Sequence, residues 1–239
     1  MTPQEAILAG VNRQIGYHAM LRAFLAYTEW RIPRQNPDAP PTFVVTDEAM
    51  TISAWLLSSE DAHQAAANKF HAAAIGPIWR EKILENVIAE LDPKIAVLRI
   101  DPASPISLDI QTDQLDVFRR IARGARSERA MAEGRYADIK SYAYYVPYFG
   151  VLGQGHNVIA LPTPHGDMVA AFTAEDMIET FMATGSDADR ERVSFVRVTG
   201  EELFGTAGPT LAKGVIVNFA SAHPYGFTLD ACRDITAAS

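Results

Sequence analysis

The sequence predicts an α+β protein in which helices flank mixed and antiparallel sheets, and three observations support this fold class. Short β-branched runs, as at residues 42–46 and 158–161, alternate with longer segments whose apolar residues recur at helical spacing. Residues 95–100 and 106–110 flank a short proline-containing segment, which is the pattern of an antiparallel strand pair. The same order of elements recurs about 115 residues later, so we expect one structural unit used twice.

The chain should begin with a helix, because Thr2 can cap the first turn and Pro3 suits the first helical position. Apolar residues at helical spacing continue to about Tyr27, and Gly16 marks a break within this stretch. Ser58, followed three residues later by an acidic residue, predicts the start of another helix. The other elements expected in the first half are strands at 42–46, 52–57, 95–100 and 106–110 and helices at 60–74, 83–91 and 112–121.

The second half repeats this plan by pattern and spacing rather than by residue identity. The corresponding segments are 30–33 and 144–147 at an offset of 114, 57–61 and 172–176 at 115, and 96–104 and 214–221 near 117. Because strand and helix patterns recur in any α/β chain, chance agreement is the alternative. The domains expected are a first repeat with an N-terminal helix at 1–121, a linker at 122–135 and a second repeat at 136–239.

The segment expected as the linker is rich in arginine and poor in apolar residues. From Arg119 to Arg135 the chain carries six arginines against Glu128 and Glu133. A solvated helical face explains this composition most simply, and a small basic contact for an acidic partner is the alternative.

Composition and charge limit the classes of function. Of the 239 residues, 48% are hydrophobic and 21% charged, as in ordinary globular proteins. Residues 1–120 carry 11 Lys and Arg against 15 Asp and Glu, and residues 121–239 carry 10 against 14, so each half is −4 and nucleic-acid binding is not expected. Cys232 is the only cysteine, and we expect no disulfide, metal or cofactor. No signal peptide and no apolar run of membrane length is visible, so we expect a cytoplasmic protein without membrane insertion.

Two short motifs in the second half carry a family resemblance. Residues 171–176 (Ala-Phe-Thr-Ala-Glu-Asp) have the form of a strand-to-helix junction, and residues 214–218 (Gly-Val-Ile-Val-Asn) form an apolar strand that ends in asparagine. In this combination the chain resembles the SseB N-terminal-type domain, over about residues 140–235 well and 20–121 more loosely. Where the family pattern continues with proline, this chain has Phe219. The resemblance implies tandem bacterial α+β interaction domains that have no established reaction.

The most suggestive polar cluster is His165-Gly166-Asp167. It could present an imidazole and a carboxylate at a turn, where acid–base groups and metal ligands often lie. The same residues also form good turns, because glycine takes positive φ and aspartate can bond its own backbone. The turn is the simpler interpretation.

Aromatic side chains supply a second group of candidates. Tyr144 and Tyr145 belong to a tyrosine cluster before a glycine-rich loop, where such rings either pack in a core or line a binding surface. The glycine spacing of that loop fits no nucleotide-binding motif. His223 and Tyr225 lie in the turn expected between the last two strands, and a nearby serine and aspartate complete the residue types of a hydrolase triad without the accompanying nucleophile motif.

These observations predict a non-catalytic interaction or regulatory protein that binds a protein partner through an open sheet edge. The alternative is a small-molecule-binding protein or hydrolase, whose site would lie near Tyr144, Tyr145, His165, Asp167 and His223. No residue is assigned a catalytic role. The two hypotheses differ in what the fold must supply, since one needs an unpaired strand and the other needs those side chains to converge.

Overall fold

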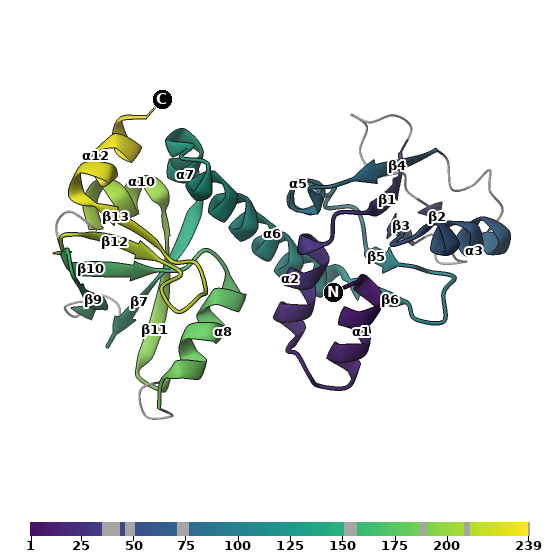
Figure 1. Ribbon diagram of the computed structural model, residues 1–239, viewed down its shortest axis with the longest axis horizontal. Coiled ribbons are helices and arrows are strands. Elements are labelled where there is room, and N and C mark those ends of the chain that lie inside the picture. Colours follow the sequence, from purple (N-terminus) through teal and green to yellow (C-terminus); the bar gives the residue numbers. More distant parts are fainter. Residues whose placement is uncertain are drawn as a thin grey trace. The chain divides into compact units, whose positions relative to one another are not determined.

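The computed structural model describes residues 1–34, 44–45, 51–70, 77–150, 157–186, 190–207 and 211–238. It divides the chain into two compact units, Met1–Ala122 and Arg123–Ser239 (Figure 1). Each unit combines helices with mixed and antiparallel strands, so the predicted α+β class is confirmed. Parts of the expected strand at 42–46 and of the helix expected at 60–74, and the glycine-rich loop after residue 150, lie outside the described residues.

The elements of the first unit are α1 (Pro3–Val11), α2 (Tyr17–Ala26), β1 (Trp30–Pro33), β2 (Val44–Val45), β3 (Ile52–Leu56), α3 (Glu60–Phe70), β4 (Ile78–Glu81), α5 (Leu84–Ala89), β5 (Val97–Ile100), β6 (Leu108–Gln111) and α6 (Thr112–Ala132), which continues into the second unit. One sheet has the order β2-β3-β5-β6, with β3 and β5 parallel and the outer pairs antiparallel. The antiparallel pair β1–β4 forms the other. Two backbone hydrogen bonds between Arg31 and Leu57, of 2.8 and 2.9 Å, connect β1 to the end of β3.

The elements of the second unit after α6 are α7 (Tyr136–Ser141), β7 (Ala143–Phe149), β8 (Asn157–Val158), β9 (Ala160–Thr163), β10 (Gly166–Ala171), α8 (Glu175–Thr184), β11 (Val193–Thr199), α10 (Gly200–Glu202), the π-helical turn η1 (Leu203–Ala207), β12 (Gly214–Val217), β13 (Tyr225–Thr228) and α12 (Leu229–Ala237). One sheet has the order β9-β10-β12-β13, with β10 and β12 parallel. The other is antiparallel, in the order β11-β7-β8. A bridge between Tyr145 and Phe172 connects them.

The two units have the same connectivity. In each, an antiparallel pair (β1–β4 or β7–β11) stands beside a sheet whose two central strands are parallel. The bridge in the first unit joins Arg31 to Leu57, and the bridge in the second joins Tyr145 to Phe172. Tyr145 lies 114 residues after Arg31, and Phe172 lies 115 residues after Leu57, which are the offsets expected from the sequence. Among the described residues, β8 has no counterpart in the first unit.

The N-terminal helix begins as its sequence predicts. Thr2 Oγ1 accepts a hydrogen bond from the Glu5 N–H at 3.2 Å, and Glu5 Oε2 accepts one from the Thr2 N–H at 2.7 Å, which completes a capping box. The expected single helix to Tyr27 is instead two helices. The chain turns at Arg13, whose φ is +57°, and α2 starts after Gly16, so the break lies where glycine marked it.

The arginine-rich segment predicted as the linker at 122–135 is helical over residues 122–132, and the boundary between the two units falls at its start. α6 runs unbroken through residue 132 and ends at Gly134, whose φ of +66° suits a helix C-terminus. Within 122–135, most of the buried residues are small, as Ala122, Gly124, Ser127 and Ala130. The Cβ that alanine would add at Gly124 would lie 2.8 Å from the Ala174 Cβ, so α6 approaches the start of α8 closely.

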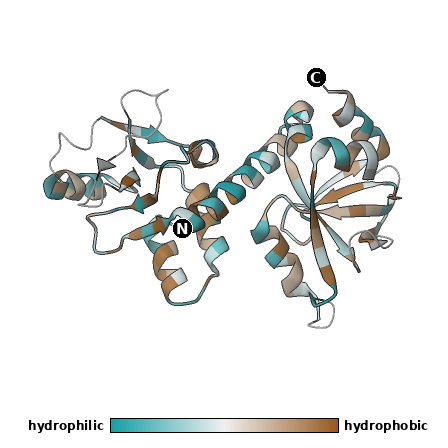
Figure 2. Cartoon of the chain, turned by 180° about the vertical axis from the view of Figure 1, so that it is seen from behind, coloured by the Kyte–Doolittle hydropathy of each residue, from teal (hydrophilic) through white to brown (hydrophobic). Residues whose placement is uncertain are grey.

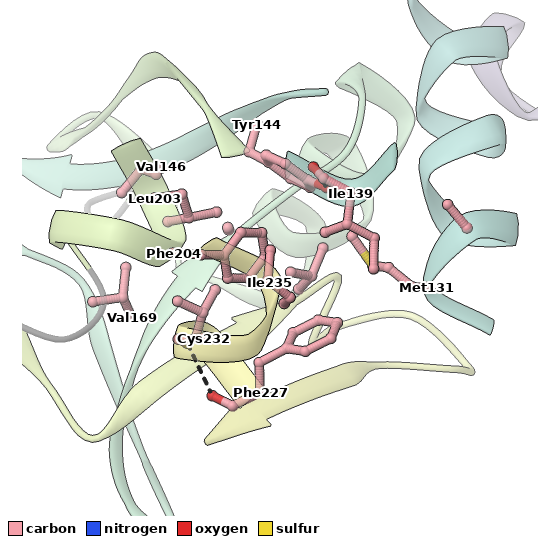
Figure 3. Close-up of a cluster of buried hydrophobic side chains, with 14 residues drawn as sticks. Met131, Ile139, Tyr144, Val146, Val169, Leu203, Phe204, Phe227, Cys232 and Ile235 are labelled. Carbon is pink, nitrogen blue, oxygen red and sulfur yellow. Dashed lines mark hydrogen bonds between the residues drawn. The ribbon is translucent and has the colours of Figure 1, made fainter. Parts of the chain in front are cut away.

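The core of the second unit lies between its strands and the helices α7, η1 and α12. Side chains from these elements and from the end of α6 point toward one another in Figure 3; they include Met131, Ile139, Tyr144, Val146, Val169, Leu203, Phe204, Phe227, Cys232 and Ile235. The Cys232 thiol donates to the Phe227 carbonyl oxygen at 3.7 Å. Burial raises the pKa of this thiol to about 11, so it stays a neutral packing group near neutral pH.

The core of the first unit is built around aromatic side chains. Phe24 packs edge-on against Trp30 and Phe118, with ring centroids 6.3 Å apart in both pairs. Trp55 lies at the centre of a smaller cluster and meets Phe70 at 4.9 Å. Figure 2 shows apolar residues alternating with polar ones along the described helices. Within the described residues, no helix is both long enough and apolar enough to cross a membrane.

Candidate functional site

Tyr144, one of the predicted binding residues, is a core residue. Its side chain is fully buried and packs edge-on against Phe204, with centroids 5.6 Å apart. Its hydroxyl donates a hydrogen bond to the Ile139 carbonyl oxygen at 3.0 Å and lies 2.9 Å from Ser127 Oγ. Burial raises the pKa of this hydroxyl far above its usual range, so it stays protonated. These partners satisfy the hydroxyl inside the protein, which corrects the prediction that it meets a ligand.

The first unit has a matching aromatic donor. Trp30, at the start of β1, donates from Nε1 to the Phe24 carbonyl oxygen of α2 at 2.9 Å. Tyr144, near the start of β7, does the same to Ile139 of α7. In both units a buried ring therefore donates to a carbonyl in the last turn of the preceding helix, and that carbonyl also accepts the N–H of the helix's C-cap residue.

Tyr145 and Tyr225 are partly buried and already engaged. The Tyr145 hydroxyl donates to Glu175 Oε1 at 3.1 Å and so connects β7 to the first turn of α8. Tyr225 begins β13 and packs against the core of the second unit. Its pKa is raised, first by burial and second by the charge of Glu128. The Tyr145 hydroxyl thus bonds α8 and not another of the predicted site residues.

His165 is exposed in the turn between β9 and β10, and Asp167 is exposed at the start of β10, opposite Pro162 of β9. Gly166 takes a φ of +99°, as the turn interpretation requires. Thr163, rather than the aspartate, supports the turn with its side chain. Its Oγ1 donates to the Gly166 carbonyl oxygen at 2.7 Å and accepts from the His165 N–H at 3.2 Å.

His223 lies at the other end of the same sheet. It is exposed in the loop after β12, and β12 runs parallel to β10. From Gly166 to Ala171, β10 spans roughly 17 Å at the usual rise of a strand, which separates the His165 turn from the His223 loop. The predicted residues therefore do not converge on one site. Among the described residues, no group of three or more His, Cys, Asp and Glu side chains is placed to hold a metal ion.

A buried polar network does occur at the ends of the parallel strands β10 and β12. Asn218, directly after β12, has a φ of +54° and is 2% exposed. Its Oδ1 accepts from the Thr173 N–H at 3.0 Å, and its Nδ2 donates to Glu128 Oε1 at 3.0 Å. The Thr173 hydroxyl donates to the same Glu128 oxygen at 2.6 Å. The network thus fastens the strand-to-helix junction before α8 to α6.

The first unit has the same network with acid and amide exchanged. Asp101 follows β5 with a φ of +49° and is fully buried. Its Oδ1 accepts from the Ser58 N–H at 2.7 Å, and its Oδ2 accepts from Ser58 Oγ and Gln4 Nε2, both at 2.5 Å. Here the helix supplies the amide and the strand end supplies the carboxylate, whereas Glu128 and Asn218 do the reverse.

The buried Asp101 predicts a pH dependence of the first unit. Burial raises its carboxyl pKa, and the hydrogen bonds from Ser58 and Gln4 lower it by less. Because the folded pKa is raised, the stability contributed by this group is full below the unfolded pKa of about 4 and is lost as pH rises through the folded value. The unfolding free energy of the wild type minus that of Asp101→Asn should therefore fall as pH rises over this window.

Urea unfolding followed by tryptophan fluorescence measures this difference, since Trp30, Trp55 and Trp79 all belong to the first unit. Asparagine also suits the positive φ, so the variant keeps the turn, and the other carboxyl groups titrate alike in both proteins. A difference that stays constant or increases with pH would contradict the prediction.

β11 forms the open edge of the antiparallel sheet in the second unit. In the order β11-β7-β8 it has a neighbouring strand on one side only, within the described residues. None of its seven residues is buried. An edge strand of this length is a template for pairing with another extended segment.

The hydrogen bonds of β7 show which groups of β11 point outward. Tyr145 uses its N–H and C=O to bond Phe172, each at 2.8 Å, on the side away from β11. In an antiparallel pair the opposite residue, Arg197, must then also direct its N–H and C=O away from its neighbour. Pro147, which has no N–H, lies opposite Phe195 and fits the same alternation. Phe195 and Arg197 therefore present their backbone groups to the open edge.

Phe195 is also part of a phenylalanine cluster on the α8 side of this sheet. The cluster comprises Phe172, Phe181, Phe195 and Phe219, and its ring centroids lie 5.2 to 6.5 Å apart. Only Phe172 is fully buried, and the other three are partly exposed. Phe195 therefore belongs both to the open edge of the sheet and to this partly exposed phenylalanine cluster.

The corresponding edge of the first unit is shorter and engaged with its own chain. β4 has four residues, Ile78–Glu81. Trp79 donates from Nε1 to the Arg34 carbonyl oxygen at 3.2 Å, and Glu81 forms an ion pair with Arg34 at 3.1 Å. β11 is therefore the stronger candidate for a partner.

The comparisons with known proteins find no match to this chain: no family model, no curated protein and no solved structure.

No sequence motif assigns a functional role to Asn218, Thr173, Phe195 or Arg197. The sequence did contain a signal for Asn218. It lies 117 residues after Asp101, which is the offset expected between the strands that these two residues follow. Their side chains differ in charge, so residue identity concealed the correspondence. No local signal identifies Phe195 and Arg197, because the open edge is defined by which strand pairs with which.

Proposed function

We propose that this chain is a non-catalytic interaction or regulatory protein, and that β11 accepts an extended segment of a protein partner as an added strand. The observation that carries the proposal is the outward direction of the N–H and C=O groups of Phe195 and Arg197 on an edge strand with no buried residue. Strand addition obtains affinity from such main-chain groups and specificity from alternate side chains.

We further propose that the two units are copies of one SseB-like repeat. Three features support this: the common strand order, the bridges at offsets of 114 and 115, and the paired networks at Asp101 and Asn218. The motifs that resemble the family lie at the structural junctions, since Thr173 and Asn218 bond each other. These residues support the fold, which fits a family without an established reaction.

The alternative, a small-molecule-binding protein or hydrolase, gains no support from the geometry. Tyr144 is buried in the core, and His165 and His223 lie at opposite ends of one sheet. An exposed strand edge is the feature that remains.

The strand-addition proposal predicts that Val193→Pro weakens partner binding by tenfold or more, because it removes an N–H that points away from β7. Val193 lies opposite Phe149 and has the same orientation as Phe195 by alternation. Val193→Ala is the matched control, since it shortens the side chain and keeps the N–H. The probe is a set of extended peptides selected from a random display library on the full chain, with affinities measured by calorimetry.

Amide hydrogen exchange measured by nuclear magnetic resonance supplies the direct readout. Bound peptides should protect the amides of Phe195 and Arg197, which face the edge, and leave that of Val196, already bonded to β7, unchanged. Equal affinity for both Val193 variants, or protection confined to other strands, would overturn the proposal.

A further inference from the structure

The side chain of Arg197 has no acidic neighbour on its own sheet. It is exposed, and the residue opposite it on β7 is Tyr145. Within the described part of the chain, its guanidinium makes no hydrogen bond or ion pair. Other arginines do, as Arg119 with Asp116 at 2.7 Å and Arg233 with Asp230 at 3.0 Å. In a chain of net charge −8, this arginine lies at the edge where a further strand would be added.

A second arginine lies at the same edge. Arg192, directly before β11, is exposed and stacks its guanidinium over the Phe149 ring, 5.8 Å from the centroid. Arg192 and Arg197 therefore lie on either side of Phe195 in the chain, although by strand alternation Arg192 points to the other face of the sheet. Within β11 itself, Arg197 is the only charged residue.

Phe195 and Arg197 lie on one face, because side chains two residues apart in a strand point the same way. Phe195 contacts Phe172 and Phe181 at centroid distances of 6.1 and 6.5 Å, which places this face on the side of α8. The ring is partly exposed, so an added strand would cover it. Residues directly opposite on neighbouring strands have Cβ atoms about 4.5–5.5 Å apart, close enough for charge pairing and apolar contact.

From this geometry we propose that the segment bound along β11 is an acidic one, with a carboxylate opposite Arg197 and a large apolar side chain opposite Phe195. The inference rests on the proposed strand addition. β7 is antiparallel to both of its neighbours, β11 and β8, and a new strand antiparallel to β11 continues that pattern. Read from its N-terminus, the partner then carries an acidic residue, any residue and a large apolar residue.

The test uses defined peptides as long as β11 on the full chain. The first is Thr-Val-Glu-Val-Ile-Thr-Val, which places Glu opposite Arg197 and Ile opposite Phe195 in the antiparallel register. The second has Lys in place of Glu. The Glu peptide should bind the wild type about tenfold more tightly than the Lys peptide, because it exchanges a like-charge pair for an opposite-charge pair. Arg197→Glu should invert this preference, and Arg197→Ala should remove most of it.

The controls separate this inference from the strand addition on which it rests. A Glu peptide with N-methyl groups at the positions that face β11 keeps the charge and loses the main-chain bonds, so it should not bind. If both unmodified peptides protect the Phe195 and Arg197 amides with equal affinity, strand addition stands and the acidic preference is wrong. If neither protects them and no selected peptide does, both proposals are wrong. Concentration-dependent protection without peptide would identify a second copy of this chain as the occupant and overturn the acidic partner.

Discussion

Phe172→Ala is expected to lower the free energy of unfolding of the second unit by about 3–5 kcal/mol, the usual cost of deleting a fully buried phenylalanine ring. The ring has no exposed surface. It stacks on Phe181 at 5.2 Å and contacts Phe195 and Phe219, so its removal leaves a cavity that three elements would have to fill. Its backbone also bonds Tyr145, so the surrounding junction cannot collapse freely.

Urea unfolding of the full chain, with hydrogen exchange of the β10 and β12 amides, measures this loss. Tryptophan fluorescence serves as an internal reference, because all the tryptophans lie in the first unit. Phe219→Ala is the matched control, since this partly exposed ring of the same cluster should contribute only about 1–2 kcal/mol. A loss below about 1 kcal/mol for Phe172→Ala would show that the junction after β10 is not core.

Asn218→Ala should destabilise the second unit by about 3–4 kcal/mol, because it leaves the buried Thr173 N–H without its acceptor and takes a donor from Glu128. Alanine also tolerates the φ of +54° less well than asparagine, which adds about 1 kcal/mol. Asn218→Gly removes the same hydrogen bonds but suits the positive φ, so it should cost about 1 kcal/mol less than alanine. Equal losses would mean that the backbone conformation contributes nothing.

The paired networks supply a sharper control for the same experiment. Asn218→Asp places a buried carboxylate against the partly buried Glu128, and the two negative charges repel, so this variant should be strongly destabilised near neutral pH. Adding Glu128→Gln creates the acid–amide arrangement that Asp101 and Gln4 show in the first unit, and it should restore most of the loss. Additive effects of the two substitutions would contradict the network as described.

Local signals were sufficient for individual elements. The capping box at Thr2, the break near Gly16 and the positive φ of Gly166 all follow from side-chain chemistry within a few residues. The sequence did not reveal which side of the arginine-rich stretch is buried. Its buried side is made of small residues such as Gly124 and Ala130, whose burial depends on how closely α8 and the core approach, and composition alone does not reveal that.

The sequence by itself determined the α+β class and the order of elements, and the spacing near 115 residues pointed to one connectivity used in both halves. These depend on hydrophobic periodicity and turn residues, which act over short distances. Only the tertiary structure decided the candidate site. Tyr144 lies in the core, His165 and His223 lie at opposite ends of one sheet, and Arg197 lies on an open sheet edge. Strand pairing sets these positions, and it joins residues that are far apart in the chain.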